Sequence, residues 1–133
     1  MTTAYLNRIA TAVPANDVHD CFVRYARSRF ADNRRQAAFQ RMADRAQIDH
    51  RWSFLAPADR PDGGSVDAEG FYTRGRFPTT AQRMGRYEAT AGALAVRAVA
   101  GLDLGAKAAA ITHLITISCT GLFAPGIDLE VIR

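Results

Sequence analysis

The segment 111–118 constrains the fold most, because it is apolar on both faces of an extended chain. A run of this kind predicts a central strand that is covered by helices on each side. It leads into Cys119-Thr120-Gly121, which indicates a turn, and Gly126 with Asp128 then indicates the start of a helix. We therefore expect a buried strand, a turn and a helix in succession.

Capping residues and apolar spacing predict three helices before this strand, over about 18–30, 33–46 and 80–99. Their expected buried sides consist of Val18, Phe22, Tyr25 and Ala26, then Phe39, Met42 and Ala46, and then Met84, Tyr87, Ala91, Leu94 and Ala98. Segments 5–13 and 50–55 predict strands, and 56–70 predicts a long loop. This order of elements is typical of an α/β layered fold, a mixed sheet with covering helices. The sheet is incomplete unless further buried strands join it.

The composition indicates soluble, folded material, with 48% apolar and 23% charged residues. No apolar run reaches the ~18 residues of a membrane-spanning helix, and no signal peptide is recognisable. Cys21 and Cys119 lie too far apart in sequence to suggest a disulfide framework, which fits a reducing, cytoplasmic location. Cys21, in the middle of a predicted helix, is expected to be a packing residue.

Most motifs for metal, nucleotide or nucleic-acid chemistry are missing from the sequence. It contains no glycine-rich phosphate loop, no paired CxxC and no HExxH, and its three histidines, His19, His50 and His113, are isolated from one another. No aromatic-and-basic platform or helix-turn-helix pattern is recognisable. We therefore expect no metal site and no nucleic-acid partner, and a structural role for His113 in its predicted strand.

The basic residues form one pattern that could carry binding. The formal net charge is +4, and positive side chains concentrate between Arg24 and Arg51. Arg34, Arg41 and Arg45 follow at seven- and four-residue steps, which places them on one face of the second predicted helix. Guanidinium groups bind phosphate by paired hydrogen bonds, so this face suits a phosphate-bearing ligand. A solvated helix face explains the same pattern.

Cys119 has two interpretations when the residues are considered alone. It ends a predicted strand close to the start of a helix, and the positive end of that helix would favour a nucleophilic thiolate. However, no base is recognisable beside it, and a cysteine in a core is more often a small apolar filler.

Several motifs resemble one family. The specific block is Ser118-Cys119-Thr120-Gly121 with Ala124-Pro125-Gly126-Ile127-Asp128, preceded by His113-Leu114. Supporting blocks are Phe71-Tyr72-Thr73-Arg74-Gly75-Arg76-Phe77-Pro78-Thr79-Thr80, Phe39-Gln40-Arg41-Met42-Ala43-Asp44-Arg45 and Ile9-Ala10-Thr11-Ala12-Val13-Pro14. Together they resemble the N-terminal half of bacterial type III polyketide synthases, the chalcone-synthase family, over almost the whole chain.

The resemblance implies a thiolase-like fold with two αβαβα halves in a homodimer. The family condenses an acyl-CoA starter with malonyl-CoA to make polyketides, with no acyl carrier protein and no bound cofactor. Residues 1–133 correspond to the first part of the first half. The acyl-carrying cysteine and its His and Asn partners come later in the family, so we expect these residues alone to be inactive.

The family's binding residues can be carried over one at a time. Cys119 and Thr120 match positions that line the starter and elongation cavity, so Cys119 is expected to be a pocket residue and not the acyl carrier. Ala124 matches a Met that reaches across the dimer in plant members, and the nearby Phe123 could take over part of that role. Arg41 and Arg45 match two positions that bind the CoA phosphates. A third basic position is Ala38 here, and Arg34 is expected to compensate.

Two other functions fit the same residues. One is a fragment of a ketoacyl-carrier-protein synthase III, which shares the thiolase fold. The other is a non-catalytic half-domain that binds CoA or a partner protein through Arg34, Arg41 and Arg45.

Overall fold

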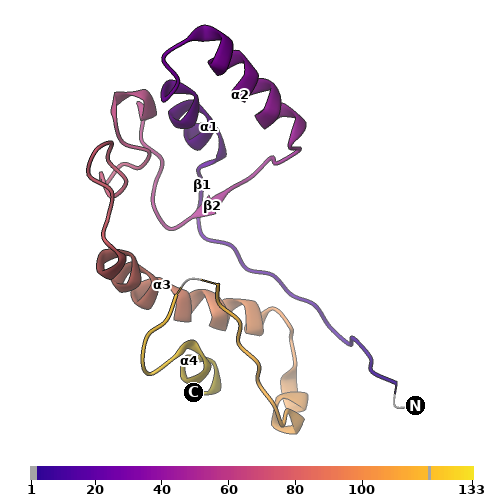
Figure 1. Ribbon diagram of the computed structural model, residues 1–133. Coiled ribbons are helices and arrows are strands. Elements are labelled where there is room, and N and C mark those ends of the chain that lie inside the picture. The colour runs from indigo at the N-terminus through magenta and orange to yellow at the C-terminus, as the bar shows by residue number, and fades with distance from the viewer. Residues whose placement is uncertain (1–2, 120) are drawn as a thin grey trace. The chain divides into compact units, whose positions relative to one another are not determined.

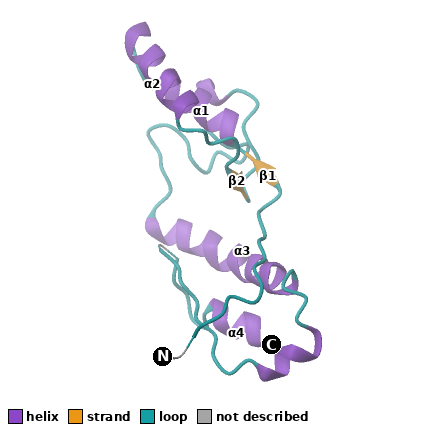
Figure 2. Cartoon of the chain, turned by 90° about the vertical axis from the view of Figure 1, so that its right-hand side faces the viewer, coloured by secondary structure: helices purple, strands orange, loops and turns teal. Residues whose placement is uncertain are grey.

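The computed structural model describes residues 3–119 and 121–133 of the chain. It is helix-rich with one small sheet, which is compatible with an α/β class (Figures 1 and 2). The elements are β1 Asn16–Asp17, α1 His19–Ser28, α2 Asn33–Arg45, β2 Trp52–Ser53, the 3-10 helix η1 Pro61–Gly63, α3 Thr80–Ala100, the 3-10 helix η2 Gly105–Ala110 and α4 Ile127–Ile132. The chain forms two compact units, residues 14–79 and residues 1–13 with 80–133.

Local capping and one aromatic contact shape the helices of unit 14–79. The side chain of Asp32 accepts a hydrogen bond from the backbone N–H of Arg35 at 2.8 Å, which satisfies one of the unpaired donors at the start of α2. The rings of Phe30 and Phe39 lie 5.6 Å apart and join the end of α1 to α2. Helices α1 and α2 therefore form where capping and apolar spacing predict them.

The long segment after β2 is fixed by buried groups. Leu55 and Cys21 are buried, and the Cys21 thiol donates to the Val66 carbonyl oxygen at 2.9 Å. The buried Asp67 carboxylate accepts hydrogen bonds from the backbone N–H groups of Phe71 at 2.8 Å and Tyr72 at 2.7 Å. These bonds satisfy backbone groups that a loop would otherwise leave to water. The expected packing role of Cys21 is confirmed.

The other unit is organised around α3. Helix α4 packs on it at Gly92, where an added Cβ would lie 3.0 Å from Cγ of Glu130, so the Glu130 side chain would have to shift to admit a larger residue. The predicted stripe of α3 is half-buried throughout. At the end of α3, the guanidinium of Arg8 donates to the carbonyl oxygens of Leu102, at 2.6 Å, and Asp103. This contact fastens segment 3–13 to the unit.

Two predicted strands are not formed. Segments 5–13 and 111–118 are extended but make no ladder in the described part of the chain, and the only sheet described there pairs β1 with β2 in antiparallel fashion. Their side chains are largely exposed, with Ile117 92% accessible, and His113 is exposed as well. The predictions of a buried strand and of a buried His113 were therefore wrong for this structure. A strand needs a neighbour for its backbone groups, and neither segment has one here.

Other predictions were wrong in detail. The predicted strand 50–55 is reduced to Trp52–Ser53. Of the three residues predicted to form the buried side of α2, Met42 is 61% exposed and Ala46 is exposed, so only Phe39 packs inward. On α1, Phe22 was predicted to be buried and is 41% exposed. In a unit this small, there is too little core to cover every apolar side chain. Among the described residues, no helix combines the length and apolarity needed to cross a membrane.

Candidate functional site

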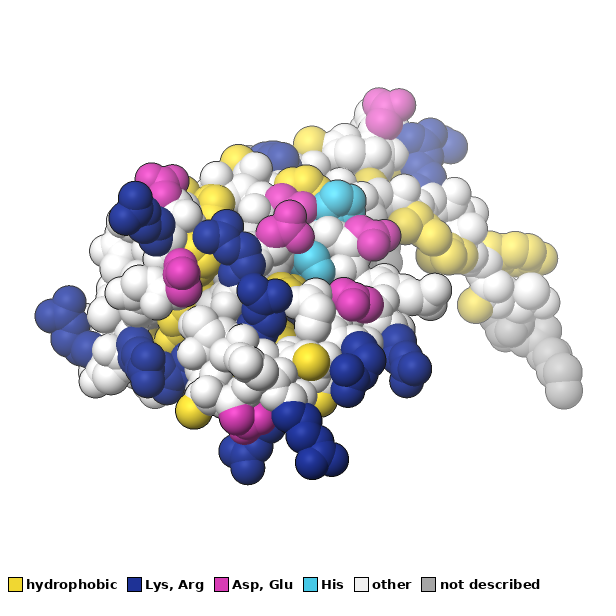
Figure 3. All heavy atoms as spheres, turned by 90° about the horizontal axis from the view of Figure 1, so that it is seen from above, with side chains coloured by type: hydrophobic (Ala, Val, Ile, Leu, Met, Phe, Trp, Pro, Cys, Tyr) yellow, Lys and Arg dark blue, Asp and Glu magenta, His cyan; other side chains and the backbone are white. Residues whose placement is uncertain are grey.

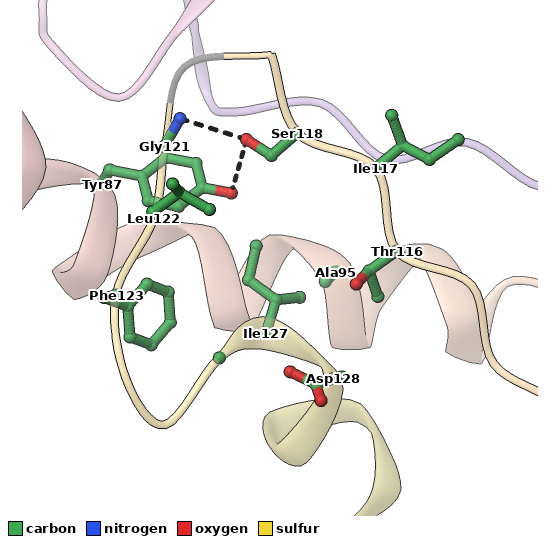
Figure 4. Close-up of a pocket in the computed structure, with 11 residues that line it drawn as sticks. Tyr87, Ala95, Thr116, Ile117, Ser118, Gly121, Leu122, Phe123, Ile127 and Asp128 are labelled. Atoms are coloured by element: carbon green, nitrogen blue, oxygen red, sulfur yellow. Dashed lines mark hydrogen bonds between the residues drawn. The ribbon is translucent and has the colours of Figure 1, made fainter.

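A cavity of about 720 Å³ lies in the unit built on α3 (Figure 4). Helix α3 contributes Tyr87 and Ala95, and the extended chain and the start of α4 supply the remaining walls. These lining residues are Thr116, Ile117, Ser118, Gly121, Leu122, Phe123, Gly126, Ile127 and Asp128. The lining is mainly apolar with a few hydroxyls, a composition that suits an acyl chain with occasional oxygen atoms.

The hydroxyl of Ser118 is the polar centre of this cavity. Its Oγ accepts a hydrogen bond from the Tyr87 hydroxyl at 3.0 Å and another from the backbone N–H of Gly121 at 3.2 Å. Figure 4 shows the three groups meeting above α3. A serine hydroxyl that accepts twice can still donate its own proton, so Ser118 is able to bind a carbonyl oxygen.

Gly121 is required by close packing against Tyr87. The glycine is buried, and an added Cβ would overlap the Tyr87 ring. The same ring meets Phe123 edge to face, with centroids 6.0 Å apart. Gly121 and Phe123 thus pack against the Tyr87 ring on the aromatic side of the cavity.

Of the three predicted pocket residues, the structure describes Cys119 and Ala124. Cys119 and Ala124 are exposed and do not belong to the described cavity lining, whereas Phe123 does. Ala124 is joined to Pro125 by a cis peptide bond. Thr120 lies outside the described residues. The assignment of Cys119, Thr120 and Ala124 to a substrate pocket stays a prediction.

The predicted phosphate-binding arginines all lie on α2. Arg34, Arg41 and Arg45 are exposed, and within residues 3–119 and 121–133 none of their guanidinium groups takes part in an ion pair or hydrogen bond. On the face seen in Figure 3, Lys and Arg side chains are interspersed with Asp and Glu and do not gather in a single patch. The arginines are thus accessible to an anion, and their role in binding CoA stays a prediction.

An ion pair that sequence spacing did not predict joins β1 to the segment before β2. Nδ1 of His50 lies 2.6 Å from Oδ2 of Asp17, and Oδ1 of Asp17 accepts from the backbone N–H groups of His19 and Arg51, both at 3.0 Å. The His50 ring also stacks on Trp52, with centroids 5.4 Å apart. The sequence offers Asn16 or Asp17 as the cap of the predicted helix 18–30, but no sequence signal pairs Asp17 with a histidine 33 residues away.

The hydrogen bonds of this pair shift both pKa values. The bond from His50, followed by those from the Arg51 and His19 backbone, lowers the pKa of Asp17 from 3.8 to about 2. The bond to Asp17 raises the pKa of His50 above 6.5. Desolvation lowers this pKa by a smaller amount, and the charge of Asp49 raises it. The pair is therefore charged at mildly acid pH.

In the described part of the chain, no group of three or more His, Cys, Asp or Glu side chains could hold a metal ion. Comparisons with protein-family models, curated proteins and solved structures found no match for this chain.

Proposed function

We propose that this chain is part of an acyltransferase of the type III polyketide synthase family, which condenses an acyl-CoA starter with malonyl-CoA without an acyl carrier protein. One observation carries the proposal. The block Ser118 to Asp128, whose sequence resembles that family most specifically, bounds an apolar cavity of about 720 Å³. The volume is within the usual range of small-molecule sites, roughly 300–1,000 Å³.

The proposal gives each part of the cavity a role. Apolar side chains such as Leu122, Phe123 and Ile127 would pack against the acyl chain and exclude water from it. The Ser118 hydroxyl would donate to a carbonyl oxygen of the bound acyl group, because Tyr87 and Gly121 already fill its acceptor positions. These residues bind and orient the acyl group and form no covalent bond with it.

The arginines of α2 would bind the phosphates of CoA. Arg41 and Arg45 are accessible and unpaired among the described residues, so an arriving phosphate displaces no internal partner. Arg34 lies on the same helical face and adds a third positive charge. The proposal includes a homodimeric, cytoplasmic enzyme.

Calorimetric titration with CoA tests the phosphate contacts. We expect Arg41→Ala with Arg45→Ala to weaken CoA binding about tenfold or more, because a hydrogen bond to a charged group contributes ~1.5–3 kcal/mol. The control is Arg24→Ala with Arg29→Ala, which removes the same charge from α1 and the residue that follows it. Pantetheine, which lacks phosphate, should not distinguish the two double variants. No binding of CoA, or equal weakening in both, contradicts the proposal.

A condensation assay tests the role of Cys119. Incubation with hexanoyl-CoA and malonyl-CoA should yield no chain-extended product, because the proposal makes Cys119 a pocket residue and Cys21 is buried in packing contacts. The readout is product mass by chromatography and mass spectrometry. Extended products that disappear in Cys119→Ala would show that Cys119 is the nucleophile and that its assignment to the pocket is wrong.

A CoA-binding module without condensing activity is the second candidate. It is favoured by the accessible arginines of α2, which need no cavity to bind phosphate. Nuclear Overhauser contacts between hexanoyl-CoA and the isotope-labelled chain, measured by NMR, separate the two candidates. Contacts from the acyl chain to Leu122, Phe123 or Ile127 are expected for the acyltransferase, and contacts confined to the CoA moiety are expected for the module.

A further inference from the structure

The cavity at Tyr87 carries one charged side chain to which the proposed function gives no role. Asp128 lies in the first turn of α4 and lines the cavity, and Figure 4 shows it next to Ile127. The other described lining residues are apolar, hydroxyl-bearing or glycine, and none of them is Lys, Arg or His. The described lining therefore presents a negative charge to a bound molecule and no positive charge.

The missing side chain of Gly126 leaves room for this carboxylate. A Cβ added at Gly126 would lie 2.5 Å from Oδ1 of Asp128 and 3.8 Å from the carbonyl oxygen of Phe123. Gly126 has an extended backbone, with φ at −76° and ψ at 177°, which any residue can adopt. Glycine therefore provides space here and not a special backbone conformation, and two oxygen atoms border that space.

Both oxygen atoms are able to accept a hydrogen bond from a ligand. Within the described residues, the Asp128 carboxylate takes part in no ion pair or hydrogen bond, and the Phe123 carbonyl oxygen accepts none. A carboxylate in the first turn of a helix interacts favourably with the helix dipole, but that interaction leaves its acceptor positions unused. A donor arriving from a ligand would thus displace no internal partner.

The two polar positions of the cavity favour different groups of one ligand. Ser118 can donate to a carbonyl oxygen, because its acceptor positions are filled by Tyr87 and Gly121. An ionised carboxylate only accepts, so Asp128 favours a donor or a positive charge. We propose that the acyl group bound here carries an amine, whose ammonium contacts the Asp128 carboxylate. This inference rests on the proposed acyl-binding role of the cavity.

The test compares hexanamide with 6-aminohexanamide, which share a carbonyl oxygen and a chain length and differ in the terminal amine. The methyl groups of Ile117, Leu122 and Ile127 line this cavity, so their NMR chemical shifts report binding there. We expect the wild-type chain to bind 6-aminohexanamide about threefold to fivefold more tightly, as for an ion pair that solvent can reach. Asp128→Asn should remove this preference.

Two further variants separate the charge from its position. Glu88→Gln removes the same charge from an exposed residue of α3 that does not belong to the described lining, so it should leave the preference unchanged. Gly126→Ala keeps the charge, but its Cβ would displace the Asp128 carboxylate, so the preference should fall. Circular dichroism checks that each variant folds, and Gly126→Ala decides alone if Asp128→Asn does not fold.

The outcomes distinguish this inference from the proposed function. If hexanamide shifts the three methyl groups but the preference is absent in the wild-type chain or persists in Asp128→Asn, the amine contact is overturned and acyl binding stands. An equal loss of preference in Glu88→Gln also overturns the amine contact, because net charge would then explain it. If neither amide shifts the methyl groups, the acyl-binding role of the cavity fails together with the inference.

Discussion

At the scale of single residues, a few polar groups determine how segments far apart in sequence meet. Asp17 illustrates this, because one carboxylate accepts the N–H at the start of α1, the N–H of Arg51 and the ring of His50. Removing the carboxylate would release all three contacts at once. The same group also makes this contact sensitive to pH.

The pH dependence of the Asp17–His50 pair has a defined sign. The pKa of His50 is raised in the folded chain, so its contribution to stability is complete below about 6.5 and is lost as pH rises through the folded value. The pKa of Asp17 is lowered to about 2, so its contribution is present above 3.8 and is lost as pH falls toward 2. Both contributions are therefore present between roughly pH 4 and 6.5.

Thermal unfolding at pH 5.5 and 8.5 tests this sign. The wild-type chain should melt at a higher temperature at pH 5.5, and His50→Asn should reduce the difference. His113→Asn serves as the control, since His113 lies in the other unit and its ring nitrogen contacts only the neighbouring Thr112 among the hydrogen bonds described. A difference that persists in His50→Asn would show that the pair does not govern the pH response.

At the scale of elements, segment 111–118 carries an exposed apolar surface and an unpaired backbone. Ile115 and Ile117 are 83% and 92% exposed, and among the described residues no neighbouring strand pairs with them. Unpaired, extended, β-branched segments of low charge associate readily with one another. We predict that the chain self-associates through this segment.

Sedimentation velocity over a range of concentrations measures that association. Ile115→Lys with Ile117→Lys should shift the population toward monomer, because like charges oppose strand pairing. Met42→Lys with Ile48→Lys adds the same charge at exposed apolar positions of the other unit and should have a smaller effect. Equal effects of the two double variants would mean that net charge, and not this segment, controls association.

At the scale of the whole molecule, the elements that depend on nearby residues were predicted from the sequence, whereas the elements that depend on distant partners were not. Helices α1, α2 and α3 were predictable because capping and apolar spacing act within a few residues, as Asp32 shows. Strands 5–13 and 111–118 were not, because a strand depends on partners that local spacing cannot supply. In the site, the block 118–128 was singled out by its residue types, whereas the contacts of Tyr87 with Ser118 and Phe123 join residues more than 30 positions apart and were not predictable.

The division of the chain into two units affects which parts of its sequence can change independently. The polypeptide leaves one unit after Val13 and returns to it at Thr80, so residues 14–79 are connected to it as a guest domain is connected to its host. Insertions or deletions within residues 14–79 leave the spacing of residues along α3 and α4 unchanged. Such an arrangement allows the arginine-bearing helix to diverge in sequence while the host retains its cavity.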